Sequence, residues 1–287
     1  MLPRPSIFRM ALKMRLLSLL PLLLLAAACG HRQPPHPPSQ PLRSATLQQL
    51  VTTFNQDARA IHSMSLKLNL SARAGKHKYP KISAYLLIRK PGDIRLWGTF
   101  TLIGKLFDMA SNGQVFQLSL PTRNQFIVGR NSVIPKKVSN PLQKLRPQVI
   151  LNAMLTHPIS ATAEVALDPG APPDTYQVLV LETQADHEQR LVRRITFSRY
   201  DLLPHRQQIY DGDGIHLTSA TYNNYTVRDN LPIPTAITIE RPVEGYTLNL
   251  QLLPAGITIN KPLTAPHTFE LTPPAGAAVI TVGNRRR

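Results

Sequence analysis

The sequence predicts a mainly β protein of the α+β class, built on one large antiparallel sheet. Apolar residues recur at every second position through much of residues 66–252, which is the period of half-buried strands. Two stretches have helical spacing instead, so the predicted order is helix, about six strands, short helix and about six strands. The two strand-rich halves share one pattern with no obvious linker between them. We therefore expect a single sheet and not two domains.

Composition limits what the chain can be. With 43% hydrophobic and 17% charged residues, its 287 residues have the composition of a globular protein. The single Cys excludes an intramolecular disulfide framework and any Cys-based zinc site. The 33 Lys and Arg against 16 Asp and Glu give a formal charge of +17, which favours anionic partners.

The first 28 residues predict a secretory signal peptide. Four basic residues precede an almost continuous apolar run over 16–25, and three alanines follow it. The run is too short to span a bilayer core comfortably, since that takes about 20 residues. Removal of residues 1–28 would lower the charge from +17 to +13, because the segment holds four basic and no acidic residues.

The only Cys stands directly after this signal. The segment Leu25-Ala26-Ala27-Ala28-Cys29-Gly30 resembles the lipobox of bacterial lipoproteins, although Ala26 stands where that family most often has Leu. The resemblance implies cleavage before Cys29, diacylation of its thiol and acylation of the new amino terminus. The absence of Asp at position 30 favours the outer membrane in a Gram-negative source. The alternative is an ordinary signal peptide with a chance Cys.

Residues 29–45 form the predicted tether, comprising the lipidated Cys and a polar, Pro-rich spacer. An amphipathic helix follows over 47–61, with apolar residues at steps of three and four. Thr46 and Gln49 have the spacing of a capping box at its start.

The period then changes to two. Strands are predicted around 66–70, 82–88, 94–100 and 124–128, and a hairpin over 106–120 turns at Asn112-Gly113. A short helix is expected at 147–155, because Pro147 suits a first helical turn. Residues 156–173 are rich in Ala, Pro and Gly and predict a loop. Six more strands follow between 176 and 252, so the single domain is placed at 46–270 and a basic tail at 271–287.

At the level of pattern, residues 45–255 resemble the lipoprotein carrier and receptor proteins of the Lol system (LolA and LolB). The helix at 47–61, the strand at 66–70, the stretch 94–109, residues 116–129 and Leu145-Arg146-Pro147 carry this resemblance. It implies a large antiparallel sheet curled into an incomplete barrel, covered by the N-terminal helix and the short mid-chain helix. It also implies binding of acyl chains on the apolar concave face, and no enzymatic activity.

Two sets of site residues follow from this resemblance. The cavity that binds lipid is expected to be lined by inward-facing apolar residues, namely Phe54, Leu66, Leu68, Leu70, Leu86, Leu96, Phe100, Ile195, Phe197, Leu248 and Leu250. Leu102 and Ile103 stand about where the receptor of that system has a protruding loop that inserts into the membrane. Their alternative is a place in the core of a strand.

The sequence lacks the common catalytic and metal-binding signatures. It contains no H-E-x-x-H, no G-x-S-x-G and no Gly-rich phosphate loop. Asp211-Gly212-Asp213-Gly214 lacks the later Glu of an EF-hand loop and predicts a turn. We expect no catalytic residues, no metal, no cofactor and no nucleic-acid partner.

These observations lead to one main hypothesis and two alternatives. The main hypothesis is an envelope lipoprotein, anchored through Cys29 to the outer membrane and facing the periplasm, that binds lipid or the acyl chains of other lipoproteins. It would act as a receptor or transfer component whose partner is a periplasmic carrier or an assembly protein. The first alternative is a structural or assembly lipoprotein that binds a protein or the cell wall and has a filled interior. The second is a hydrolase, which requires a buried acid–His pair in a cleft.

Overall fold

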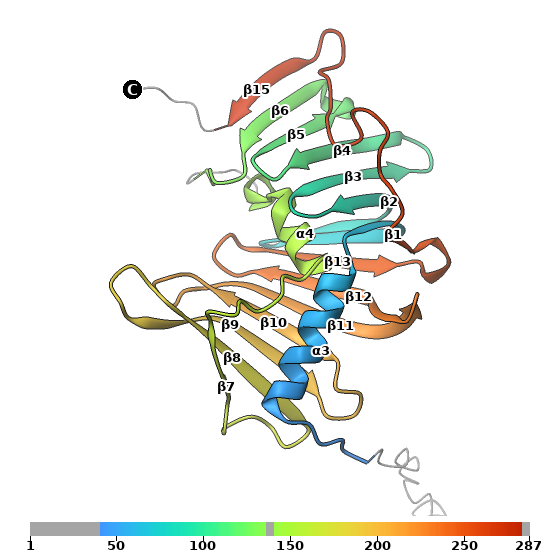
Figure 1. The fold of residues 1–287 in the computed structure, drawn as a ribbon. Coiled ribbons are helices and arrows are strands. Elements are labelled where there is room, and N and C mark those ends of the chain that lie inside the picture. The colour runs from blue at the N-terminus through green and yellow to red at the C-terminus, as the bar shows by residue number, and fades with distance from the viewer. Residues whose placement is uncertain (1–40, 136–140, 283–287) are drawn as a thin grey trace, which may run out of the picture. The chain divides into compact units, whose positions relative to one another are not determined.

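The computed structural model describes residues 41–135 and 141–282. The predicted signal peptide, Cys29, residues 29–40 of the tether and the last five residues of the predicted tail lie outside the described residues. From Leu42 onward the chain forms one compact unit. Its described part is a large sheet with two α-helices, α3 (Leu47–Ala60) and α4 (Pro147–Met154) (Figure 1).

Fifteen strands make up the sheet in the described part of the chain. The first half of the chain supplies β1 (Ser63–Ala74), β2 (His77–Arg89), β3 (Asp93–Phe100), β4 (Gly104–Asn112), β5 (Val115–Leu120) and β6 (Gln125–Arg130). The second half supplies β7 (Glu164–Leu167), β8 (Thr175–Thr183), β9 (Gln189–Ser198), β10 (Pro204–Tyr210), β11 (His216–Arg228), β12 (Leu231–Arg241), β13 (Tyr246–Leu252), β14 (Thr258–Ile259) and β15 (Ala278–Val282). Three short 3-10 helices are η1 (Pro121–Arg123), η2 (Pro141–Lys144) and η3 (Pro254–Gly256).

Two meanders meet in the middle of this sheet. Neighbouring strands run in the order β15-β6-β5-β4-β3-β2-β1-β13-β12-β11-β10-β9-β8-β7, and β14 also pairs with β1. The halves join where β1 pairs with β13, with Leu68 opposite Leu252. All pairings are antiparallel except that of β15 with β6. Because β15 and β7 end the path without pairing to each other, the sheet is unclosed. This confirms the predicted mainly β fold and its single sheet.

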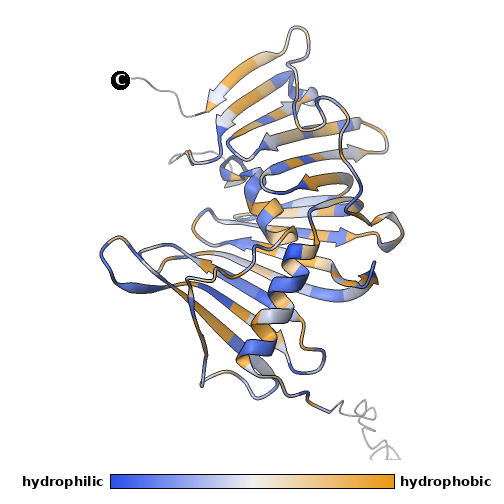
Figure 2. Ribbon diagram, in the orientation of Figure 1, coloured by the Kyte–Doolittle hydropathy of each residue, from blue (hydrophilic) through white to orange (hydrophobic). Residues whose placement is uncertain are grey.

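Helix α3 begins where the sequence places it. The Thr46 hydroxyl accepts from the Gln49 amide N–H at 3.2 Å, and the Gln49 side chain accepts from the Thr46 N–H at 2.8 Å, which completes the predicted capping box. The buried stripe of α3 packs against strands β8 and β9. Within this cluster the Phe54 and Phe197 rings meet edge to face at 6.1 Å. Figure 2 shows apolar and polar residues in turn along the helix.

Helix α4 is covered by a second and larger apolar cluster. Ile150 and Leu151 are fully buried among residues of β1 to β4 and β11 to β13. Pro147 occupies the first turn of α4, as predicted. The buried Arg146 fixes its start: the guanidinium donates to the carbonyls of Val133, Gln143 and Leu145.

Two predictions about irregular segments were wrong. The expected loop at 156–173 contains β7, which pairs with β8, and the expected tail at 271–287 contains β15, which pairs in parallel with β6. Both strands are short and lie at edges of the sheet, so their hydrogen bonds come from one neighbour and leave little periodicity in the sequence. The segment before β15 is held against β3 and β5, since Arg95 donates to the Thr268 carbonyl and the Gln117 side chain accepts from the Leu271 N–H.

Among the described residues, no helix is both long and apolar enough to cross a membrane.

Candidate functional site: a cavity beneath helix α3

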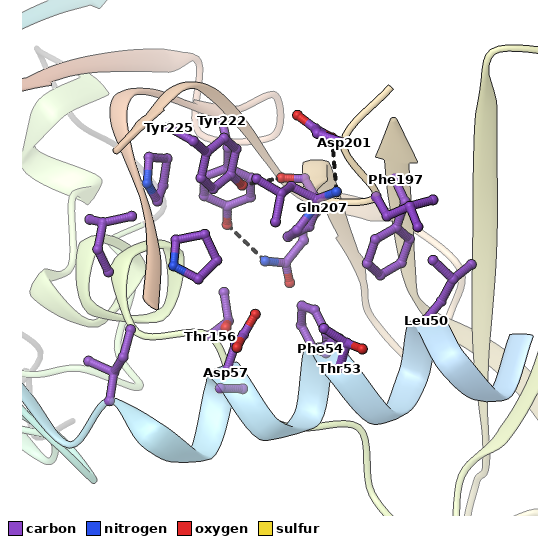
Figure 3. A pocket seen from close by; sticks show the side chains of 18 of the residues that line it. Leu50, Thr53, Phe54, Asp57, Thr156, Phe197, Asp201, Gln207, Tyr222 and Tyr225 are labelled. Atoms are coloured by element: carbon purple, nitrogen blue, oxygen red, sulfur yellow. Dashed lines mark hydrogen bonds between the residues drawn. The ribbon is translucent and has the colours of Figure 1, made fainter. Parts of the chain in front are cut away.

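A cavity of about 470 Å³ lies between α3, the C-terminal end of α4 and strands β9 to β12 (Figure 3). Its volume falls within the range of roughly 300–1,000 Å³ that is typical of small-molecule sites. Most of its wall is apolar, and the main apolar lining residues are Leu50, Phe54, Ala58, Ile61, Met64, Met154, Leu155, Phe197, Leu202, Tyr222, Tyr225, Ile233 and Ile237. We call it the α3 cavity.

Helix α3 presents two parallel stripes to the α3 cavity. Leu50, Phe54 and Ala58 follow one another at four-residue steps and are buried. Gln49, Thr53 and Asp57 form a polar stripe one position earlier in each turn, and they also line the cavity. Ala58 lies in the last turn of α3, and its small side chain leaves part of the cavity unfilled there.

Two prolines of β12 form part of the sheet wall of the cavity. Pro232 and Pro234 pair with β11 on one side, opposite Val227 and Tyr225. Pairing of β12 with β13 begins only at Ala236, because a proline has no N–H to donate to a second neighbour. The first part of β12 is therefore free of β13, and both prolines line the cavity there.

A buried polar network closes the cavity between the sheet and α4. Arg193 Nε donates to Gln207 Oε1 at 2.9 Å, Gln207 Nε2 donates to the Tyr222 hydroxyl at 2.9 Å, and that hydroxyl donates to the Ala153 carbonyl at 3.1 Å. Burial lowers the pKa of Arg193 to about 10 and raises the pKa of Tyr222. The network ties strands β9, β10 and β11 to helix α4.

Three charged side chains line the cavity as well: Asp57, Lys90 and Asp201. Burial raises the pKa of the Asp57 carboxyl and lowers the pKa of the Lys90 ammonium, since each charged form loses water. Lys90 Nζ donates to the Ala58 carbonyl at the end of α3. Asp201 Oδ2 lies 2.9 Å from His205 Nε2.

The Asp201–His205 pair bears on the hydrolase alternative. Both side chains are about one-third exposed, at 38% and 34%, so the pair is not buried. Among the described residues, no hydroxyl or thiol is hydrogen-bonded to His205. The described part of the chain also holds no group of three His, Cys, Asp or Glu residues arranged for a metal ion. The pair therefore does not supply the arrangement that the hydrolase alternative requires.

The structure brings only part of the predicted cavity set together. Phe54 and Phe197 line the α3 cavity, and Ile195 is buried in the cluster beside them. Phe100 is partly exposed at the end of β3. The other seven lie in the filled cluster around α4: Leu66, Leu68, Leu70, Leu86, Leu96, Leu248 and Leu250.

Leu102 and Ile103 lie in the turn between β3 and β4. Their side chains are 91% and 58% exposed, so they are not part of a strand core. The β1–β2 hairpin turns at the same end of the sheet, because consecutive antiparallel strands alternate in direction. It carries four exposed basic residues, Arg73, Lys76, Lys78 and Lys81.

Periodicity and motifs do not identify Asp57, Lys90, Tyr222 or the two prolines of β12 as site residues. One signal for Asp57 was present, because an acidic residue in the last turn of a helix opposes the helix dipole. Lys90 and Tyr222 reach the cavity only through strand pairing, which local spacing does not reveal.

Comparisons with known proteins concern mainly the fold. No protein-family profile matches the chain, and no curated protein matches it at a significant level. A DUF1329 family protein from Desulfovibrio piger has a similar structure, with 14% identity, a TM-score of 0.51 and coverage of 76% of this chain and 93% of that chain. A LolA superfamily protein from Nitrosomonas europaea gives 13% identity, a TM-score of 0.47 and coverage of 76% and 96%. A domain from Vibrio parahaemolyticus, described as outer membrane lipoprotein-sorting, gives 10% identity, a TM-score of 0.46 and coverage of 74% and 93%.

At such low identity these likenesses concern the fold alone, and we base no argument on the two with TM-scores below 0.5. The match to the Desulfovibrio piger structure and the unclosed sheet with its two helices agree with the architecture expected from the Lol-system resemblance. The predicted architecture, one large unclosed antiparallel sheet with an N-terminal and a short mid-chain helix, is thereby confirmed.

Proposed function

We propose that this protein binds lipid, or the acyl chains of other lipoproteins, in the α3 cavity. The observation that carries the proposal is the cavity itself: about 470 Å³ of space with a mostly apolar wall, beneath a helix on one face of an unclosed sheet. Each methylene moved there from water gains about 0.8 kcal/mol, so a chain of ten methylenes gains roughly 8 kcal/mol before the cost of ordering it.

The proposed place of action is the cell envelope. The lipobox-like segment around Cys29 supports a lipid anchor, and Gly30 supports the outer membrane in a Gram-negative source. The exposed Leu102 and Ile103 support a loop that enters the membrane and passes cargo between the cavity and the bilayer. In this role the protein is a receptor or transfer component that works without a chemical step.

A cavity-filling variant tests this function. Ala58→Phe places a ring in the α3 cavity, whereas Gln56→Phe adds the same ring to the exposed face of α3. Both variants would be made in the chain from residue 30 onward, which retains the whole compact unit. The measurements are native mass spectrometry with organic extraction for co-purifying lipid, and uptake of a fluorescent fatty acid.

We expect lipid in the parent and in Gln56→Phe, and a loss of at least tenfold in uptake in Ala58→Phe at an unchanged or higher Tm. A parent chain that carries no lipid and takes up no probe would refute lipid binding and favour the structural or assembly alternative. A parent that binds lipid and an Ala58→Phe variant that binds it equally would place the lipid elsewhere.

A further inference from the structure

Asp57 is an unpaired carboxylate in an apolar cavity. It lines the α3 cavity, and Figure 3 shows its side chain directed from α3 toward the sheet. No hydrogen bond or ion pair joins it to any other residue in the described part of the chain. The Tyr225 hydroxyl lies close enough to interact electrostatically with Asp57, but it already donates its hydrogen bond to the Pro204 carbonyl.

This position is costly for the fold in two ways. The half-buried carboxylate loses part of its water, which raises its pKa. Asp57 also stands in the last turn of α3, where the helix dipole favours a cation and opposes an anion. An Asn would avoid both costs in the same space. A charge that costs stability and contacts nothing in its own chain is typical of a residue that contacts a ligand.

The neighbouring charges do not satisfy Asp57. Lys90 is the cation that lines the same cavity, but its ammonium donates to the Ala58 carbonyl, and burial alone accounts for its lowered pKa. Asp201 adds a second carboxylate to the wall, paired with His205. Two carboxylates therefore line the cavity, against one lining cation that is already in use. The Arg193 guanidinium lies over the Phe54 ring, 4.9 Å from its centroid, but does not line the cavity and is held by Gln207 and the His157 carbonyl.

We propose that the α3 cavity selects amphiphiles that carry a protonated amino group close to an apolar chain. The ammonium would donate to the Asp57 carboxylate, and the chain would lie along Leu50, Phe54 and Phe197. This inference rests on the proposed function and names its ligand class. The shared chemistry occurs in the headgroup of an aminophospholipid and in the free amino terminus of an S-alkylated cysteine.

The test compares three probes with the same twelve-carbon chain and different head groups: dodecylamine, dodecanol and dodecanoate. Each displaces an uncharged fluorescent alkyl probe, whose own affinity does not depend on the charge of Asp57, from the chain from residue 30 onward, below the critical micelle concentration. Asp57→Asn removes the charge at constant shape. Asp174→Asn is the control, because Asp174 is exposed and does not line the cavity. Thermal unfolding of each variant shows that it is folded.

We expect the parent and Asp174→Asn to bind dodecylamine at least tenfold more tightly than dodecanol, as a charge-assisted hydrogen bond in an apolar site would give. Asp57→Asn should lose that preference and bind dodecanol as before. Equal binding of amine and alcohol by the parent, a preference for dodecanoate, or an unchanged amine preference in Asp57→Asn would overturn the inference and leave lipid binding standing. Failure of all three probes to bind would instead refute the proposed function.

A second set of probes separates the two sources of the amino group. One arm compares lysophosphatidylethanolamine with lysophosphatidylglycerol. The other compares an S-hexadecyl cysteine peptide with a free amino terminus and the same peptide acetylated. Dependence on Asp57 in the first arm alone would identify a phospholipid headgroup, and dependence in the second alone would identify a peptide amino terminus. Dependence in neither arm would overturn the inference.

Discussion

The exposed turn between β3 and β4 gives the sharpest test of membrane contact. Leu102 is 91% exposed there, so the fold gains almost nothing from its side chain. Leu102→Asp should therefore change the free energy of unfolding by no more than about 0.5 kcal/mol, as for other surface substitutions. If the turn enters a bilayer, the same side chain gains about 1.5–3 kcal/mol by leaving water. Its loss should lower the partition coefficient roughly 10- to 150-fold.

The assay is sedimentation with vesicles of phosphatidylethanolamine and phosphatidylglycerol, using the chain from residue 30 onward so that no lipid anchor contributes. The exposed basic residues of the β1–β2 hairpin lie at the same end of the sheet. Each contributes about 1 kcal/mol near an anionic surface. Binding of the parent should consequently weaken when phosphatidylglycerol is omitted or salt is raised.

Val227→Asp is the matched control. Val227 is 62% exposed on β11, next to the β11–β12 turn at the opposite end of the sheet. The reasoning fails if Leu102→Asp partitions like the parent, or if Val227→Asp loses as much binding as Leu102→Asp.

Three further predictions concern the interior. Tyr222→Phe should lower the free energy of unfolding by about 2 kcal/mol in urea titrations, because it leaves the Gln207 amide and the Ala153 carbonyl without their hydrogen-bond partner. The control Tyr200→Phe, at an exposed site, should change the free energy of unfolding little. Asp57→Asn should raise Tm at pH 7, because the raised pKa of the Asp57 carboxyl means that folding favours its neutral form. The gain in Tm should vanish well below pH 3.8, where this carboxyl is protonated in both the folded and the unfolded chain. A gain that stays constant across pH would contradict this. Asp108→Asn should lower the free energy of unfolding by about 2 kcal/mol in the same titrations, because the Asp108 carboxylate is 5% exposed and pairs with Arg95 at 3.0 Å and Lys105 at 2.8 Å. An unchanged midpoint would show that these partly exposed cations are hydrated by water instead.

Much of the fold could be predicted because its signals are local. The capping box at Thr46 and Gln49, the first-turn Pro147 and the alternation in β1 each depend on residues within one element. Strands β7 and β15 were missed because each is an edge strand whose only support is a distant neighbour. Their residues have no buried face with a clear period of two, so the sequence around them resembles that of a loop.

The cavity was harder to predict than the sheet. Alternation identifies which strand residues face the helices, but not whether a helix fills the space above them. Leu68 and Leu250 face a filled cluster under α4, while Phe54 and Phe197 face the hollow under α3. The difference depends on the small side chain of Ala58 and on the two prolines that keep β13 away from the start of β12. These are effects of packing between segments that are far apart in the chain.

The size of the cavity bears on what occupies it. A dry void costs about 24 cal/mol per Å³, so an empty cavity of about 470 Å³ would cost roughly 11 kcal/mol, comparable with the whole stability of a typical protein. Water or a ligand must therefore fill it. Water finds few partners there, because the polar groups are confined to one stripe of α3 and a few positions on the opposite wall. Apolar chains that displace such poorly bound water gain free energy. An ammonium at Asp57 would give this carboxylate the charge-assisted hydrogen bond that its own chain does not supply.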